Sequence, residues 1–306
     1  MAKLKNNKKR TKPKFNLSFW LFLAPALVAF TMVIIIPFVI GVYYSFTDWN
    51  AAGTTPNWTG LANYITLFTE SSQFTYSMLI TIVYALFNVF LLNFVSFGLA
   101  LLVTRNLKFQ NIYRVGFFLP NLVGGLILGY LWKFIFNNVI TAVGGELGFL
   151  WPSFLINRDT ALLAISITWA WQYAGYIMMI YVTAIQNIPQ ELIEAAQIDG
   201  ASAFDRLRAI TLPMVAPAFT VTLFLTLINS FKQFDVNYSL TQGGPATLFN
   251  GINLWGTKLI SMQIYDTWAI SRLPSLAQAQ ALIFFIFLTV ISIAQVRYNK
   301  SREIES

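Results

Sequence analysis

The sequence alternates between long apolar runs and shorter polar segments. Six of these runs come close to the 20 or so apolar residues that an α-helix needs to cross a bilayer. This pattern predicts an all-α membrane protein with six transmembrane helices. The six predicted spans are Trp20 to Tyr44, Met78 to Val103, Val115 to Phe136, Ala161 to Ile185, Ala218 to Phe234, and Leu276 to Val296.

The composition agrees with this pattern and excludes several kinds of chemistry. Of the 306 residues, 57% are hydrophobic and 10% are charged, whereas a soluble domain carries about 25% charged residues. The chain contains no Cys and no His, which excludes disulfides, thiolate nucleophiles, imidazole bases and Cys/His zinc sites. An enzyme would have to use carboxylates, Lys, Tyr or Ser alone, and no catalytic or metal-binding constellation of these stands out.

The Lys and Arg residues predict the orientation of the helices. Seven of the 20 lie within the first 14 residues, ahead of the first apolar run. Adding the polar segments on the same side gives 15, against three on the other side, so the positive-inside rule places both termini in the cytoplasm. The net charge of +8 would also suit a nucleic-acid partner, but its position before a membrane helix favours a topology signal and no nucleic acid.

Several predicted spans contain helix breakers and uncharged polar side chains. The third carries Pro120 with Gly124 and Gly125, which a bilayer tolerates where a neighbouring helix or a cavity satisfies the freed backbone. The polar amides favour a path for a neutral, hydroxyl-rich solute, although hydrogen bonding between helices would also explain them. These amides are Asn88, Asn93, Asn121, Gln172, Asn229 and Gln233.

The cytoplasmic segment 186–217 carries dense signals for two short helices. Asn187 is predicted to cap the first helix, with Pro189 in its first turn. Gly200 is predicted to end it, and Ser202 opens the second helix with Asp205 in a capping box. The segment therefore predicts a helix-turn-helix that lies across the face of the membrane.

This helix-turn-helix has a surface suited to a protein partner. It is expected to expose Ala195, Ala196, Ile198 and Phe204 beside carboxylates, as a shallow knob that fits a groove. An amphipathic helix resting on lipid headgroups is the alternative, but such helices favour Lys and Arg on their polar face. The first helix here carries only acidic residues, which favours the protein partner.

The same residues resemble the E-A-A loop of membrane permease subunits of binding-protein-dependent ABC importers. The pattern E-A-A-x3-G-x9-I-x-L-P is matched by Glu194-Ala195-Ala196, Gly200 and Ile210-Thr211-Leu212-Pro213, with Asp199 and Ala201 beside the glycine. Leu207 departs from it, since a Phe is more usual there. The resemblance implies a type I ABC importer permease fold for residues 19–298, between a basic tail at 1–18 and a second cytoplasmic tail at 299–306.

Further motifs resemble the carbohydrate branch of this family, which serves maltose, lactose, raffinose and glycerol-phosphate systems. Phe117-Phe118-Leu119-Pro120 is similar to its F-F-L-P, and Ser45-Phe46-Thr47-Asp48-Trp49 to its S-F-T-D-W. Phe234-Asp235 and Leu240-Thr241-Gln242-Gly243-Gly244-Pro245 are similar to its F-D...L-T-x-G-G-P. Leu273-Pro274-Ser275-Leu276 departs from the usual Gly-Tyr-Ala, which puts the outer end of the last helix in doubt.

The resemblance implies a translocation subunit of the bacterial cytoplasmic membrane that holds no cofactor itself. ATP and Mg would be bound by two partner ATPase subunits, whose grooves hold the E-A-A helices and drive alternating access. The other partners would be a second, homologous permease and an extracytoplasmic binding protein that delivers the sugar. The ATPase-coupling residues would be Glu194, Ala195, Ala196, Asp199 and Gly200.

The residues that line the substrate path are predicted from their chemistry. Aromatic faces bind the C-H surfaces of sugars, while amides and carboxylates bind hydroxyls. For Trp171, as for Trp169, packing or an interfacial belt is the alternative, and the partner permease could bind the sugar alone. The candidates are Trp171, Gln172, Tyr173, Asn229, Gln233, Asp235 and Asn237.

Two other functions fit the sequence less well. Gly251 to Lys258 reads G-x-x-x-x-G-T-K, but the Lys of a P-loop follows the second Gly directly, and this segment is predicted to lie outside the cytoplasm. An ion-coupled secondary transporter would need carboxylates at mid-membrane, and the six predicted spans contain none there.

Overall fold

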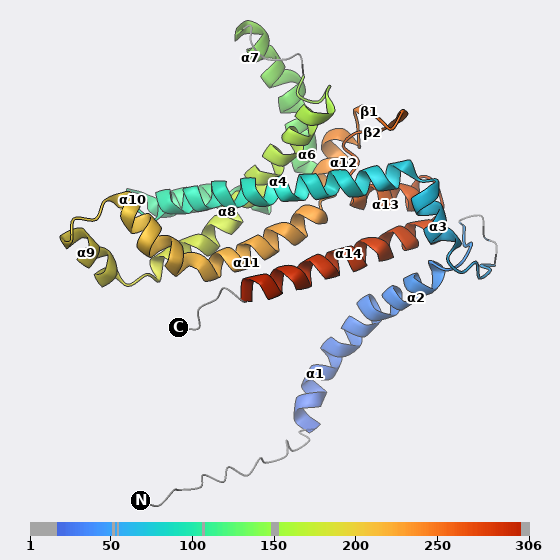
Figure 1. Ribbon diagram of the computed structural model, residues 1–306, viewed down its shortest axis with the longest axis horizontal. Coiled ribbons are helices and arrows are strands. Elements are labelled where there is room, and N and C mark those ends of the chain that lie inside the picture. The colour runs from blue at the N-terminus through green and yellow to red at the C-terminus, as the bar shows by residue number, and fades with distance from the viewer. Residues whose placement is uncertain (1–16, 51–52, 54, 106–107, 148–152, 301–306) are drawn as a thin grey trace, which may run out of the picture.

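The protein is described by a computed structural model that covers residues 17–50, 53, 55–105, 108–147 and 153–300. The predicted basic tail lies outside these residues apart from its last two positions, and so does most of the C-terminal tail. Long helices run roughly side by side, and one β-hairpin lies at one end of the bundle (Figure 1). The fold is therefore the predicted all-α fold apart from this hairpin.

Five helical stretches in the described ranges are long and apolar enough to cross a membrane. They are Phe19–Tyr44, Ser72–Val103, Gly125–Gly144, Ala203–Phe231 and Pro274–Arg297. α8 (Arg158–Gln186) is also long, at 29 residues, but is not among them.

The described elements are, in chain order, α1 (Leu17–Phe30), η1 (Thr31–Ile35), α2 (Ile36–Tyr44), α3 (Ala62–Thr69), α4 (Ser72–Val103), α5 (Gln110–Phe118), η2 (Leu119–Leu122), α6 (Gly125–Phe134), η3 (Ile135–Val139), α7 (Ile140–Leu147), α8 (Arg158–Gln186), α9 (Gln190–Ile198), α10 (Ala203–Arg206), η4 (Leu207–Thr211), α11 (Leu212–Phe231), α12 (Asp235–Thr241), β1 (Ala246–Phe249), β2 (Ile252–Trp255), α13 (Ile260–Ala269) and α14 (Pro274–Lys300).

Two of the long helices widen into a π-turn immediately before a proline. In the first span, η1 precedes α2, whose second residue is Pro37. In the stretch Ala203–Phe231, η4 precedes α11, whose second residue is Pro213. A proline lacks the N–H of the regular ladder, and its ring clashes with the carbonyl four residues earlier. The wider turn relieves both problems, so the helices continue through their prolines.

The third predicted span is not one continuous helix. The predicted run from Val115 to Phe136 is divided into α5, the 3₁₀ turn η2 and α6, with extended backbone at Val123 and Gly124. α6 and α7 then leave the plane of the neighbouring helices at a steep angle (Figure 1). Pro120 lies in the 3₁₀ turn and cannot donate a backbone hydrogen bond, which explains why the helix is interrupted within this apolar run.

The centre of the bundle is formed by α4, α8 and α11. α8 contributes the largest set of buried residues, including Trp169, Met178 and Tyr181. Tyr181 donates a hydrogen bond to Oδ1 of Asn93 at 2.7 Å, and Asn93 in turn donates to Oγ1 of Thr226 at 2.9 Å. Asn93 therefore joins helices rather than facing a path.

Asn88 serves the same purpose one turn earlier on α4. Its Nδ2 donates to Oγ of Ser166 on α8 at 3.0 Å. Both amides of α4 thus follow the alternative of hydrogen bonding between helices, which gives their Nδ2 groups partners in an apolar environment. The Oδ1 atom of Asn88 is buried without a partner among the described residues.

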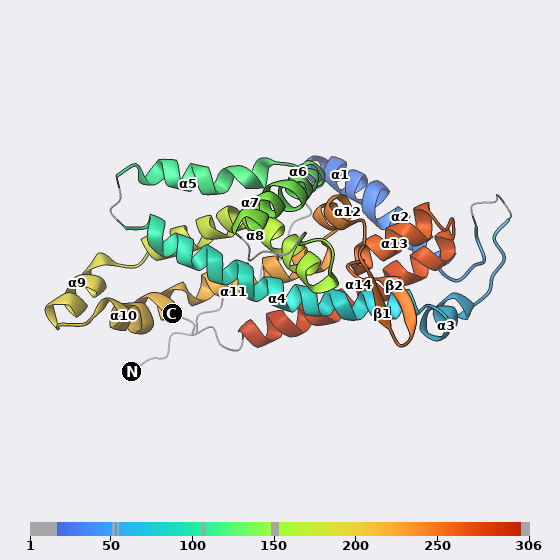
Figure 2. The same cartoon turned by 90° about the horizontal axis from the view of Figure 1, so that it is seen from above.

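The polar segments predicted to be cytoplasmic lie at one end of the bundle. The α4–α5 turn, α9 with α10, and the C-terminal end of α14 gather there, while α3 and the β1–β2 hairpin lie at the other end (Figure 2). At that other end the S-F-T-D-W segment is bonded to its neighbours: Nδ2 of Asn63 donates to the carbonyl oxygens of Ser45 and Thr47. The backbone N–H of Ser275 reaches the carbonyl of Trp49 at 3.4 Å. The outer end of α14 is thus an ordered helix despite its unusual sequence.

Candidate functional site

The α9–α10 segment projects from one end of the bundle (Figures 1 and 2). No residue of α9 is buried, so this helix is held by its ends rather than by packing on its own chain. Its first residue follows Pro189, which occupies the N-cap position without a side-chain cap. The predicted cap, Asn187, instead ends α8, because the chain continues the preceding helix up to Gln186.

The C-terminal end of α9 is fixed by a Schellman motif at Gly200. The backbone N–H of Ala201 donates to the carbonyl of Ala196 at 2.9 Å, and that of Gly200 to the carbonyl of Gln197 at 3.1 Å. Gly200 has φ +79°, a left-handed conformation that costs glycine little and other residues more. The predicted stop at Gly200 is confirmed, and the motif sets the direction in which the chain leaves α9.

The second helix begins with the predicted capping box. The backbone N–H of Asp205 donates to Oγ of Ser202 at 3.2 Å, and the backbone N–H of Ser202 donates to the Asp205 carboxylate at 3.0 Å. Nη1 of Arg206 donates to the carbonyl of Ala201 at 2.8 Å. These bonds hold the turn between the two helices in one conformation without covering its outer surface.

The outer surface of this segment combines small, apolar and acidic side chains. Glu194, Ala195 and Asp199 are exposed and Ala196 is half-buried. Ile198 is 86% exposed and Phe204 67% exposed, values that are high for large apolar side chains in water. The segment is therefore a rigid, apolar projection without a covering element among the described residues, as expected for a docking surface.

Three of the predicted path residues lie together where the third span is broken. Nε2 of Gln172 on α8 donates to the carbonyl of Val123 at 2.8 Å, which satisfies backbone freed by the break. Asp235 lies against α6, since a Cβ built on Gly125 would be 2.7 Å from its Cβ. The Asp235 carboxylate interacts electrostatically with Tyr173. Gln172, Tyr173 and Asp235 thus form one polar group beside an extended piece of backbone.

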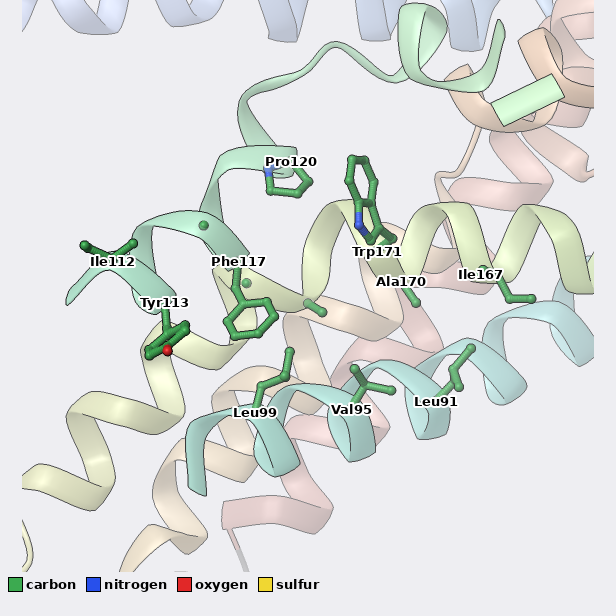
Figure 3. A pocket seen from close by; sticks show the side chains of 13 residues that line it. Leu91, Val95, Leu99, Ile112, Tyr113, Phe117, Pro120, Ile167, Ala170 and Trp171 are labelled. Carbon is green, nitrogen blue, oxygen red and sulfur yellow. The ribbon is translucent and has the colours of Figure 1, made fainter. Parts of the chain in front are cut away.

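Trp171 does not belong to this group. It lies in the wall of a cavity of about 670 Å³ between α4, α5 and α8, where its ring lies beside Pro120 and the α4 side of the wall is formed by Leu91 and Val95 (Figure 3). The ring of Trp171 packs edge-on against Trp132 at 5.7 Å. Trp169 is 1% exposed and packs against Tyr173. The packing alternative therefore describes Trp169, and Trp171 faces an apolar cavity.

Asn229 and Gln233, two further path candidates, lie on different elements although they are four positions apart. α11 ends at Phe231, so Gln233 lies beyond the helix that carries Asn229. Asn229 is half-buried, whereas Gln233 is 7% exposed and its Nε2 has no partner among the described residues.

Asn237 is 0% exposed and its amide is fully engaged. Its Nδ2 donates to the carbonyl of Thr257 at 2.7 Å, and its Oδ1 accepts from the backbone N–H of Leu259 at 3.4 Å. It therefore fixes the loop that follows the hairpin rather than lining a path.

At the helix break, backbone groups that the sequence does not predict also contribute contacts. The carbonyl of Val123 is the partner of Gln172, and the close approach of α5 to α8 depends on Gly175, where a built Cβ would lie 1.9 Å from the carbonyl oxygen of Phe117. The pair Gly124-Gly125 after Pro120 indicates the break from sequence. The contact at Gly175 cannot be predicted in this way, because Phe117 is 58 positions away along the chain.

The segment that imitates a P-loop forms part of the hairpin and the loop after it. Nζ of Lys258 lies 2.5 Å from a carboxylate oxygen of Asp266 and 5.2 Å from the ring centroid of Trp255. Both charged side chains are largely buried. Among the described residues, no group of three or more acidic side chains is placed to hold a metal ion.

Comparison with known proteins gives the family. Residues 93–303 match the model of the binding-protein-dependent transport system inner membrane component family. The chain is 42% identical over 288 residues to the "Probable starch degradation products transport system permease protein AmyD" of Thermoanaerobacterium thermosulfurigenes, covering 94% of this chain and 95% of that protein. It is 28% identical to the multiple sugar-binding transport system permease protein MsmF of Streptococcus mutans, covering 93% and 96%.

The fold has a close counterpart among solved structures. A chain of a bacterial ABC transporter involved in the import of the acidic polysaccharide alginate matches with a TM-score of 0.79 and 20% identity, covering 94% of this chain and 96% of that one. Together with the family match over most of the chain, this explains the helix bundle with its projecting α9. The chain is a membrane protein and belongs to the family of binding-protein-dependent transport system inner membrane components.

Proposed function

We propose that the chain is the permease subunit of an ABC importer that moves a neutral sugar or oligosaccharide across a bacterial cytoplasmic membrane by alternating access. In this proposal α9 occupies a groove of an ATPase subunit, and motion of that groove turns the helix bundle between two orientations. The observation that carries the coupling role is the α9–α10 segment, in which a Schellman motif and a capping box fix the turn between the helices and large apolar side chains are exposed.

The roles within this segment follow from its chemistry. Glu194 would meet a basic or amide group in the groove, while Ala195 and Ala196 let the helix approach closely. Asp199 and Gly200 would transmit the motion, because Gly200 fixes the turn through which force on α9 reaches α11. ATP and Mg would be bound by the partner ATPase subunits, and this chain would hydrolyse no ATP itself.

A neutral carbohydrate is the substrate class that the sequence and its relatives support best. AmyD is described by its name as transporting starch degradation products, which are neutral glucans. The polar group at the helix break contains a carboxylate, an amide and a phenol, from Asp235, Gln172 and Tyr173, and no cation. Such groups bind hydroxyls, whereas an acidic polysaccharide would be repelled by Asp235.

The full importer would contain three further kinds of protein. They are a second, homologous permease, two ATPase subunits and an extracytoplasmic binding protein. An ion-coupled secondary transporter is less well supported, because acidic residues of the described long helices occur only near helix starts, at Asp159 and Asp205.

The coupling role is tested with the assembled complex in proteoliposomes. Glu194→Lys and Gly200→Pro are each expected to abolish the ATP hydrolysis that sugar-loaded binding protein stimulates, since proline cannot adopt φ +79°. The matched control is Glu70→Lys, the same charge reversal on an exposed residue at the opposite end of the bundle. Unchanged stimulation in both coupling variants would contradict the assignment.

The substrate class is tested separately. A thermal-shift screen of neutral and acidic oligosaccharides on the cognate binding protein is expected to select neutral glucans. Uptake of the selected sugar should stop with vanadate and persist with ionophores. Sensitivity to ionophores without sensitivity to vanadate would favour the ion-coupled alternative.

A further inference from the structure

Arg114 on α5 has an unusual environment. Its Nε and Nη2 atoms are buried, and neither has a hydrogen-bond partner among the described residues. Among the described residues the ion pairs are Arg158 with Asp159 and Lys258 with Asp266, so Arg114 pairs with no described carboxylate. The side chain as a whole is half-buried, but two buried N–H groups without partners are costly. These two groups therefore call for an acceptor from outside the described chain.

The guanidinium adjoins an apolar groove between α5 and α8. The groove has a volume of about 480 Å³, and its other lining residues are nearly all apolar. Nε–H and Nη2–H form one edge of the guanidinium plane, which is the edge that binds two oxygens of a phosphate or carboxylate side by side. The lining residues are Arg114, Val115, Phe118, Tyr176, Met179, Ile180 and Thr183.

The groove is polar at one end and apolar at the other. Thr183 is three residues before the end of α8, at the end of the bundle that carries α9. Tyr176 is seven residues further from that end, which is about 10 Å along the helix. Arg114 lies one turn inside the start of α5 and Phe118 one turn deeper. The groove therefore runs from the headgroup level into the hydrocarbon region.

The charge around the groove is positive. Arg105 and Lys108 are exposed on the short segment between α4 and α5, just before the helix that carries Arg114. This segment contains no acidic residue. An anion at Arg114 would therefore gain from all three cations. A carboxylate of a protein partner could satisfy the guanidinium but would leave the apolar groove beside it unfilled.

We propose that this groove binds an anionic phospholipid of the leaflet on the α9 side, with the phosphate on the Nε and Nη2 edge of Arg114 and one acyl chain along Phe118, Tyr176 and Ile180. The ligand has both chemistries that the groove offers, which are a phosphate at the membrane surface and a hydrocarbon chain beneath it. The binding site does not depend on the identity of the transported solute or on the coupling role of α9.

The test measures lipid binding by the intact complex. The complex is purified in detergent, delipidated, and titrated with phosphatidylglycerol or phosphatidylcholine while bound lipids are counted by native mass spectrometry. Arg114→Gln is expected to weaken phosphatidylglycerol binding at one site by about 10- to 100-fold, the loss expected for charged hydrogen bonds. Arg114→Lys keeps the charge but cannot bind two phosphate oxygens side by side. Its phosphatidylglycerol affinity is therefore expected to lie between those of wild type and Arg114→Gln. Phosphatidylcholine binding should change little.

Arg297→Gln is the matched control, because Arg297 is exposed near the C-terminal end of α14 and is not among the residues that line this groove. Equal phosphatidylglycerol affinity in wild type and Arg114→Gln would overturn the proposal. So would release of a partner subunit by Arg114→Gln with lipid affinity unchanged, since Arg114 would then pair with protein. Competition by glycerol phosphate as effective as that by the lipid would show that the groove holds no acyl chain, and would overturn it too.

Discussion

The phenol of Tyr181 on α8 donates a hydrogen bond to Oδ1 of Asn93 on α4 at 2.7 Å. The same phenol oxygen lies 2.6 Å from Oγ1 of Thr222 on α11, so one side chain joins the three central helices. Asn93 and Thr222 are buried with it. In a membrane protein, where burial of apolar surface contributes little between helices, such polar contacts help to determine which helix faces meet.

Tyr181→Phe is expected to destabilise the complex by about 0.5–2 kcal/mol. The change removes both contacts of the phenol and leaves Oδ1 of Asn93 buried without its partner. Thermal unfolding of the purified complex in detergent measures the loss. Tyr130→Phe, on an exposed tyrosine of α6, removes the same hydroxyl from the surface and should leave the midpoint unchanged. Equal midpoints in the two variants would show that the network contributes nothing.

Gly175→Ala is expected to disrupt the contact between α5 and α8. A Cβ at this position would lie 1.9 Å from the carbonyl oxygen of Phe117, so the two helices would have to separate at a cost of about 1–3 kcal/mol. The control is Gly98→Ala on α4, where a Cβ would meet no atom within 4 Å.

The control should be neutral or stabilising by up to about 1 kcal/mol, because alanine favours a helix more than glycine does. Thermal unfolding and the yield of assembled complex are compared for the two variants. If both glycines tolerate alanine equally well, the close approach at Phe117 is not required for the fold.

Asp235→Asn and Asn237→Ala are expected to act on different properties. Asp235 is exposed at the helix break, so its variant should lower sugar transport and leave thermal stability unchanged. Asn237→Ala removes the bonds to the carbonyl of Thr257 and the N–H of Leu259, which are buried, and should cost about 2 kcal/mol of stability.

Uptake in proteoliposomes and thermal unfolding of the same preparations separate the two effects. A loss of transport at Asn237 without any loss of stability would return this residue to the substrate path. A loss of stability at Asp235 would show that its charge supports the fold instead.

The sequence predicts most of the spans because length and apolar content alone determine which helices can cross a bilayer. Five described helices meet this criterion, and α8, which contains the predicted span Ala161 to Ile185, is not among them. It also predicts the turn at Gly200 and the capping box at Ser202, since both depend on neighbouring residues. The break at Val123 could be anticipated from the proline and glycines around it. Its stabilisation could not, because the Gln172 amide that satisfies it comes from another helix.

Contacts between distant residues explain the other differences. Asp235 and Asn237 are two positions apart in α12, yet one is exposed and the other fully buried. The difference in exposure arises from the packing of α12 on α6 and on the loop after the hairpin, to which the Asn237 amide is bonded. A polar residue in an apolar segment therefore indicates that a partner exists, and the fold decides whether the partner is solute, water or backbone.

Asp48 is expected to make the stability of its loop depend on pH, at the end of the bundle that carries the hairpin. Its carboxylate accepts from the backbone N–H of Asn57 at 2.7 Å and from Nδ2 of the same residue at 3.2 Å. These bonds lower the pKa of Asp48, the backbone N–H of Asn57 being the larger cause and its side-chain amide the next. Because the folded pKa is lowered, the stabilisation is present above the ordinary pKa of aspartate, about 3.9, and is lost as the pH falls through the lowered value.

Titration of the Asp48 carboxyl by NMR, in a chain labelled at aspartate, measures the midpoint. The midpoint of the wild-type chain should lie below the ordinary value. Asn57→Ala removes the side-chain donor and keeps the backbone N–H, so it should raise the midpoint only part of the way towards that value. Thr59→Val is the control: its hydroxyl donates to the carbonyl of Phe46 and not to Asp48, so the midpoint should stay low. An unchanged midpoint in Asn57→Ala would mean that the side-chain amide of Asn57 does not lower the pKa of Asp48.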